Sequence, residues 1–159
     1  MSTDTKRRLF LKGTMAGGVV ALVAGAGLLS PRQVLAAWPK AAFEAKGLYE
    51  AMKGISGTDT ATGSADIIIK APDIAENGAV VPIKIDARKI SGVTSIAILA
   101  EKNPTPLIAN FKLGKSTQAF VSTRIKMGKT SNVIAVVSAG SKVTSARKEV
   151  KVTIGGCGG

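Results

Sequence analysis

The chain has 159 residues and a formal net charge of +12, from 22 Lys and Arg against 10 Asp and Glu. It has no histidine and a single cysteine, Cys157, which excludes an internal disulfide, a zinc finger, an iron–sulfur cluster, a haem held by histidine and a histidine-based catalytic triad. Aromatic residues make up 4% of the chain, which argues against a surface that stacks single-stranded nucleic acid. This length predicts one domain, for which we expect no metal and no cofactor.

Residues 1–36 have the pattern of an export signal. Arg7 and Arg8 precede a short apolar pair and a lysine, and an uncharged stretch rich in glycine and alanine follows from residue 13 to residue 31. A retained membrane anchor is the alternative, but this stretch is only weakly apolar for a membrane span. Small residues near Ala36 fit a cleavage site. We therefore predict a twin-arginine signal peptide, cleaved near residue 36, and a periplasmic protein without a membrane anchor. Because this route carries folded proteins, often as complexes, we also expect a partner subunit.

Residues 39–53 predict one short helix. Its apolar stripe consists of Ala45, Leu48, Tyr49 and Met52. Gly54 stands where a helix C-cap is expected.

The rest of the folded domain, which we place at residues 37–154, has the short apolar runs and turn signals of β-strands. The predicted strands are residues 65–70, 79–85, 94–100, 107–112, 118–127, 132–138 and 147–154. About seven strands with no helical period between them predict an all-β fold, an antiparallel β-sandwich, with a small barrel as the alternative.

Basic residues are densest between residues 112 and 129. They are Lys112, Lys115, Arg124, Lys126 and Lys129. They form either a solvated sheet face with its hairpin ends or a surface that guides anions or binds a partner. Acidic residues interleave with basic ones along the chain, so no run is dense enough to follow a nucleic-acid backbone.

The most informative residues follow the last predicted strand. They are Gly155, Gly156, Cys157, Gly158 and Gly159. Glycines on both sides predict a narrow, flexible arm that carries the thiol about 10 Å beyond the strand. An ordinary cysteine titrates near pH ~8.5, and no activating neighbour is evident in the sequence. Cys157 is therefore predicted to be an attachment point whose chemistry is performed by other proteins.

The chain resembles the SoxY family, the sulfur-carrier subunits of bacterial thiosulfate-oxidation systems. The resemblance rests on four features: residues 152–159, residues 123–127 leading into 131–133, the Asn103-Pro104 pair before the 107–113 strand, and the twin-arginine leader. It implies an immunoglobulin-like sandwich and a heterodimer with a SoxZ-like subunit. It also implies that Cys157 holds the sulfur substrate. A haem c-type SoxAX-like enzyme would couple thiosulfate to that thiol, a SoxB-like hydrolase would release sulfate, and a SoxCD-like sulfane dehydrogenase would act in some systems.

Two other functions are compatible with the same features. A ubiquitin-like sulfur carrier would hold sulfur as a thiocarboxylate on its last glycine, but this requires ATP, which the predicted compartment lacks. A periplasmic binding or adhesion module would use Cys157 for an intermolecular disulfide, but it would not need the surrounding glycines. An independent enzyme fits least, because no general base or pair of carboxylates stands out in the sequence.

Overall fold

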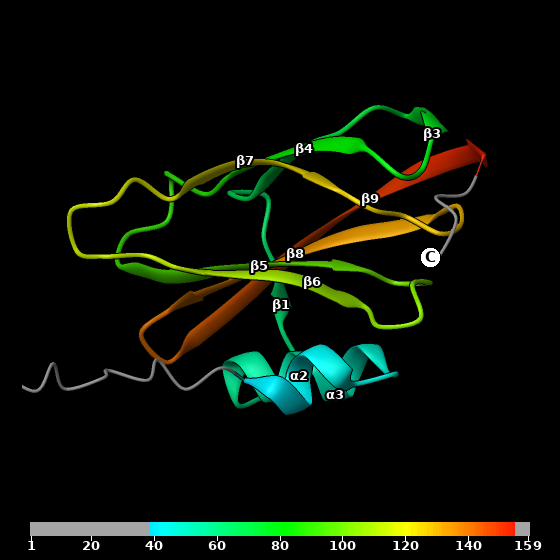
Figure 1. Cartoon of the computed structure of the whole chain (residues 1–159). Helices are drawn as coiled ribbons and strands as arrows, with labels where there is room; N and C mark the ends of the chain where they lie inside the picture. The colour runs from blue at the N-terminus through cyan, green and yellow to red at the C-terminus, as the bar shows by residue number, and fades with distance from the viewer. Residues whose placement is uncertain (1–38, 155–159) are drawn as a thin grey trace, which may run out of the picture. The chain divides into compact units, whose positions relative to one another are not determined.

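The computed structural model of the chain describes residues 39–154 (Figure 1). The predicted signal peptide, with Arg7 and Arg8, lies outside the described residues, as does the predicted arm with Cys157. Two short helices, α2 (Lys40–Glu44) and α3 (Leu48–Ser56), come first. Nine strands follow within the described range: β1 (Thr62–Gly63), β2 (Ile68–Lys70), β3 (Ile74–Asn77), β4 (Val81–Asp86), β5 (Val93–Ala100), β6 (Leu107–Lys112), β7 (Phe120–Ile125), β8 (Ser131–Ala139) and β9 (Lys142–Ile154).

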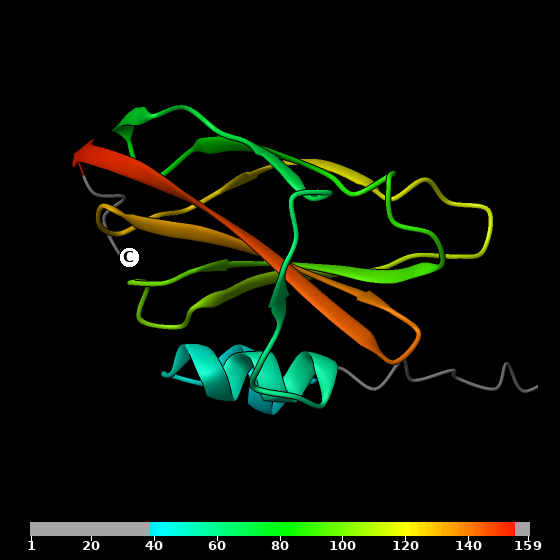
Figure 2. The same ribbon diagram turned by 180° about the vertical axis from the view of Figure 1, so that it is seen from behind.

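The strands form two sheets, which confirms the predicted β-sandwich (Figures 1 and 2). The larger sheet has the order β1-β9-β8-β5-β6, with β3 also pairing with β9, and the smaller sheet has the order β2-β4-β7. The predicted strands all occur, although β2 starts later than expected and β9 starts earlier. The predicted strands pair antiparallel, as expected, and the two strands that were not predicted, β1 and β3, run parallel to β9.

The main core lies between the two sheets. Val81, Ile83 and Ile85 of β4 are fully buried there, since alternate residues of a strand point to the same face. A second core lies on the other face of the larger sheet, where the helices cover β5, β6 and β8. Strands β5 and β8 are therefore buried on both faces, which explains their nearly continuous runs of Ile, Val, Leu and Ala.

The prediction of one helix over residues 39–53 was wrong in three respects. The chain is extended at Ala45 and Gly47, so two helices form instead of one. Gly54 lies inside α3, and a methyl group there would stand 2.6 Å from the Ala42 Cβ atom; the glycine is what lets the two helices pack closely. The actual C-cap is Gly57, at φ +76°. Finally, Tyr49 is 69% exposed and does not belong to the buried stripe.

Among residues 39–154, neither helix has the length and apolar character needed to cross a membrane.

Candidate functional site

One end of the sandwich surrounds the point where the described chain stops. We call it the arm end. It consists of Ile154 at the end of β9 and three connections: residues 78–80 between β3 and β4, 101–106 between β5 and β6, and 126–130 between β7 and β8. Figures 1 and 2 both show these turns on the same side of the molecule as the tip of β9. The predicted arm begins at the next residue, so this end is the mount on which the arm would be carried.

Gly78 fixes the tip of β9 through its backbone. Its N–H donates to the Ile154 carbonyl at 2.8 Å, and its own carbonyl accepts from the Met127 N–H at 2.7 Å. Strand β3 supports the same segment, because Asn77 pairs with Ile154 and the Thr153 hydroxyl donates to the Glu76 carbonyl at 3.0 Å. The base of the arm is thus two hydrogen bonds away from the connection between β7 and β8.

Thr130 makes a second link between that connection and β9. Its hydroxyl accepts from the Val152 N–H at 2.9 Å and lies 3.4 Å from the Val152 carbonyl, to which it donates. Both bonds are made by a half-buried side chain. They bind the 126–130 connection to the last residues of β9 before the predicted arm.

Asn103 joins two connections that are far apart in the sequence. Its side-chain amide donates to the Lys126 carbonyl at 2.8 Å, and its side-chain oxygen accepts from the Gly128 N–H at 2.9 Å. Nearby, the Asn132 amide donates to the Glu101 carboxylate at 2.8 Å, and the Glu101 N–H donates to the Asn132 carbonyl at 3.0 Å. The 101–106 connection is therefore held against the start of β8 and the 126–130 connection.

Three lysines line a hollow of about 580 Å³ between these two connections. They are Lys102, Lys126 and Lys129, and the hollow is completed by Asn103, Pro104, Thr105 and Gly128. All three lysine side chains are exposed. None of them takes part in the ion pairs found among residues 39–154, which join Lys40 to Glu44, Arg88 to Asp86 and Lys148 to Asp73. The hollow is therefore a concentration of positive charge beside the base of the arm.

The basic region predicted over residues 112–129 does not form one surface. Lys112 and Lys115 lie at the opposite end of the sandwich, where β6 ends. Arg124 lies on the outer face of the smaller sheet, and only Lys126 and Lys129 reach the arm end. Lys102 belongs to a connection 24 residues before Lys126, so no local pattern in the sequence links it to this site.

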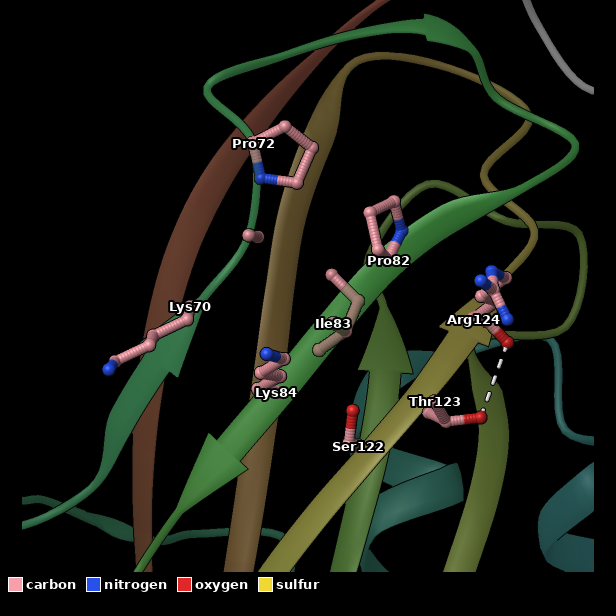
Figure 3. Close-up of a pocket in the computed structure, with 9 residues that line it drawn as sticks. Lys70, Pro72, Pro82, Ile83, Lys84, Ser122, Thr123 and Arg124 are labelled. Atoms are coloured by element: carbon pink, nitrogen blue, oxygen red, sulfur yellow. Dashed lines mark hydrogen bonds between the residues drawn. The ribbon is translucent and has the colours of Figure 1, made fainter.

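A second basic hollow, of about 500 Å³, lies on the outer face of the smaller sheet. Figure 3 shows Lys70 from β2, Lys84 from β4 and Arg124 from β7 around it, together with Pro72 and Pro82. Just after β4 ends, the Arg88 side chain is 2.6 Å from the Asp86 carboxylate and lies over the Phe120 ring. Hydrogen bonds from the Arg88 side chain are the main reason why the pKa of Asp86 falls to about 2.

No group of three or more His, Cys, Asp and Glu side chains within residues 39–154 is arranged to hold a metal ion.

Two comparisons with known proteins identify the family of this chain. A family model described as "Sulfur oxidation protein SoxY" matches residues 52–157. The chain belongs to the SoxY family. The solved structure of the sulfur carrier protein SoxY from Chlorobium limicola f thiosulfatophilum is similar to this chain, with 42% sequence identity, a TM-score of 0.60, and coverage of 66% of this chain and 94% of that chain. No curated protein matches.

Three of the four features that carried the family resemblance have described residues at the arm end. Asn103 bridges to Lys126 and Gly128, Asn132 binds Glu101, and Val152 binds Thr130. These positions are far apart in the sequence, so only the fold shows that they form one structure. The bridging role of Gly78 was missed, because it is made by backbone atoms and leaves no side-chain signal.

Proposed function

We propose that this SoxY-family protein is a carrier in thiosulfate oxidation and that Cys157 covalently holds thiosulfate-derived intermediates. The observation that carries the proposal is the extent of the family match, which continues past the folded strands and ends at Cys157. The related Chlorobium protein is itself a sulfur carrier. The anchored tip of β9, three residues before the thiol, supports the same role, because it gives the arm a fixed origin.

The proposed loading step is an oxidative coupling. The Cys157 thiol and thiosulfate form an S–S bond, giving the Cys-S-S-sulfonate adduct, and this releases one proton and two electrons. A SoxAX-like c-type haem enzyme accepts the electrons. Hydrolysis by a SoxB-like enzyme then breaks the bond between the outer sulfane sulfur and the sulfonate. Water supplies the fourth oxygen of sulfate, two protons are released, and a persulfide remains on Cys157.

The carrier does not perform these steps itself under this proposal. Its part is to hold the sulfur atom and to present it to each partner in turn. Glycines on both sides of Cys157 leave the arm little wider than the backbone, so it can enter a narrow active site. A SoxCD-like sulfane dehydrogenase would be needed to oxidise the remaining sulfur where the cycle goes to completion.

We also propose a SoxZ-like partner subunit and a periplasmic location. Family membership supports a partner within a Sox system. The location rests on the leader, in which Arg7 and Arg8 precede a weakly apolar stretch.

Intact mass spectrometry tests the proposal. The protein is purified without reductant from cells grown on thiosulfate and measured before and after reduction. We expect reducible adducts of sulfur, sulfonate or both, confined to the Cys157 peptide, and a second small protein that co-purifies. A free thiol or a plain disulfide dimer, and nothing else, would contradict the carrier role and favour the adhesion module.

A Cys157→Ser variant distinguishes the alternatives by activity. We expect complete loss of thiosulfate-dependent turnover with purified partner enzymes, since serine cannot form the S–S bond. A thiocarboxylate carrier would keep its activity in this variant, because its sulfur would be attached to a terminal carboxyl group.

A further inference from the structure

Strand β6 is the last strand of the larger sheet, and only one of its two sides is paired. It pairs with β5, and among residues 39–154 no strand lies against its other side (Figure 1). The free side is therefore an edge of the sheet, along which backbone N–H and C=O groups have no partner strand. Such an edge is a template for pairing with a strand of another chain.

The register shows which backbone groups of β6 face this free side. The Leu113 N–H donates to the Thr94 carbonyl of β5 at 2.9 Å. In an antiparallel pair, consecutive residues alternate between those that bond to the neighbouring strand and those that face away from it. The regular register of residues 109–112 therefore turns the odd-numbered residues toward β5 and leaves the backbone groups of Asn110 and Lys112 facing outward.

Side chains protect the other edges of the sandwich but not this one. Proteins commonly block an edge strand with a charge, with a proline or by keeping the strand very short. Strands β1 and β2 have only two and three residues, β3 carries Glu76, and β7 carries Arg124. In β6, by contrast, the residues from Leu107 to Phe111 are uncharged. Ile108 and Phe111 pack against the main core and are only half-buried, so an added strand would cover them further.

The charges near the two ends of β6 indicate what kind of strand fits there. Lys112 is the last residue of β6, Lys115 follows it, and Lys102 lies in the connection before it; all three are exposed. A second copy of this chain, paired antiparallel with β6, would place its Lys112 end beside the Lys102 end of the first copy, and the reverse. Like charges placed in this way repel one another. An apolar strand with acidic residues at its ends would be attracted instead.

We propose that the free edge of β6 accepts an extended strand of the partner subunit, apolar in its middle and acidic at its ends. The inference rests on the proposed function, which includes a partner subunit, and it adds where and how that subunit is held. The outward backbone groups of Asn110 and Lys112 make the attachment, and the lysines near the ends select the partner over a second copy. Because β5 and β8 lie between β6 and β9, this attachment leaves the pairing of β9 unchanged.

Hydrogen exchange within the intact complex tests the proposal. The protein is purified from cells together with the second small protein that accompanies it, and the exchange rates of single backbone amides are measured and corrected for their intrinsic rates. We expect the amides of Asn110 and Lys112 to exchange at least about a hundredfold more slowly than those of Ser122 and Arg124 in β7.

These two amides of β7 are a matched control in the same molecule. The Ala87 N–H donates to the Ala119 carbonyl at 2.8 Å, and the register of β4 and β7 continues from this pair without interruption. The odd-numbered residues of β7 therefore face β4, and Ser122 and Arg124 face the free side, as Asn110 does in β6. A free edge exchanges rapidly, so the comparison reports whether a strand covers β6 alone.

A proline variant tests the attachment itself. Asn110→Pro removes one outward N–H and leaves the inward N–H groups of the neighbouring residues to bond with β5. We expect at least about a tenfold loss in the amount of the second subunit recovered with this variant, while Asn110→Ala, which keeps the N–H, retains it. Thermal unfolding checks that the proline variant is folded. If it is not, the exchange measurement on the unaltered complex decides the matter.

A pair of lysine variants tests the acidic ends of the partner strand. K102Q/K112Q should weaken the complex about fivefold at low ionic strength, because it removes positive charge near both ends of β6. The control K70Q/K84Q removes the same charge from exposed positions on the smaller sheet, and it should weaken the complex by less than about twofold. Equal weakening by the two variants would overturn the assignment of an acidic strand.

Three further results would overturn the inference. The first is exchange at Asn110 and Lys112 as rapid as in the β7 control. The second is full recovery of the second subunit with a folded Asn110→Pro variant. The third is an assembly with two copies of this chain in which β6 is protected, which would identify a self-pairing edge. A complex that forms with β6 unprotected contradicts this inference alone, whereas the absence of any second subunit contradicts the partner of the proposed function as well.

Discussion

The arm end of the sandwich and the opposite end are built in different ways. At the arm end, connections that are far apart in the sequence are tied to one another and to β9 by Gly78, Asn103 and Thr130. At the opposite end, formed by residues 87–92, 113–119 and 140–141, the chain turns at glycines with positive φ, and the pair of Asp86 and Arg88 is local. The first arrangement joins the loops through side chains, whereas the second joins them through backbone bonds, such as the one from the Ala87 N–H to the Ala119 carbonyl at 2.8 Å.

This difference shows which end of a carrier protein must hold its loops in fixed positions. The proposed arm gains its range from glycines, so the position of its thiol depends on how firmly the arm's origin is held. Long-range side-chain bonds are concentrated at the arm end, where Asn103 and Thr130 each make two, whereas Thr94 makes one at the opposite end.

Asn103→Ala should give the largest loss of stability. It removes the two hydrogen bonds that join Lys126 and Gly128 to the 101–106 connection, so we expect a loss of about 2 kcal/mol in the free energy of unfolding. Urea titration at pH 7 measures it. Asn77→Ala is the control at the same end, since Asn77 accepts a single local bond from Ala79, and it should cost about 0.5 kcal/mol. Equal costs would remove the distinction between bridging and local bonds.

Thr130→Val and Thr94→Val compare the two ends directly. Each replaces a hydroxyl with a methyl group at nearly constant volume. Thr130 makes two bonds to Val152, and its loss should cost about 1.5 kcal/mol; Thr94 makes one exposed bond to the Ser138 carbonyl and should cost about 0.5 kcal/mol. The same urea titration serves for both. A larger loss of stability in Thr94→Val than in Thr130→Val would contradict the expected difference between the two ends.

Gly140→Ala tests the turn that joins β8 and β9 at the opposite end. Gly140 has φ +59°, which costs an alanine roughly 1 kcal/mol, and nothing lies within 4 Å of the added methyl group. Gly63→Ala is the matched control, because its surroundings are equally open but its φ is ordinary, and it should be neutral or slightly stabilising. Thermal unfolding of the two variants separates backbone strain from crowding. A cost at Gly63 as large as that at Gly140 would count against strain as the cause.

The smallest effect should come from the Asp86–Arg88 pair. The folded pKa of Asp86 is lowered to about 2 from an ordinary value of 3.8, so the pair stabilises the fold above that ordinary value, and its contribution is lost as the pH falls through about 2. Asp86→Asn should therefore flatten the dependence of the unfolding midpoint on pH between about pH 4 and pH 2. Both groups are open to solvent, so the change should be small. An unchanged acid slope in the variant would show that the pair contributes nothing measurable.

Much of the sandwich could be predicted from local patterns. Strands β5 and β8 are buried on both faces, and their long apolar runs in the sequence indicate this burial. Strand β3 was missed because Ile74–Asn77 is a strand only through its pairing with the far end of β9. The break between α2 and α3 was missed for a similar reason: the close contact of Gly54 with Ala42 favours two packed helices over one continuous helix.

The candidate site was predicted in one part and missed in another. Cys157 and its glycines stand out in the sequence, and they lie outside the described residues. The mount does not stand out, because Lys102, Lys126 and Lys129 come together only through the bridge made by Asn103. Residues that act as a group across connections leave no periodic signal in the sequence.

The long strand β9 has a mechanical consequence if the residues after it enter partner proteins, as we propose. β9 has 13 residues and pairs with β8 over residues 142–150, with β3 near its tip and with β1 near its start. A pull applied along β9 loads its hydrogen bonds in shear, so they share the tension. They are not opened one at a time, as they would be in a strand peeled from an edge. Under the proposed function, this pairing would hold β9 in the sheet each time the arm is pulled and released.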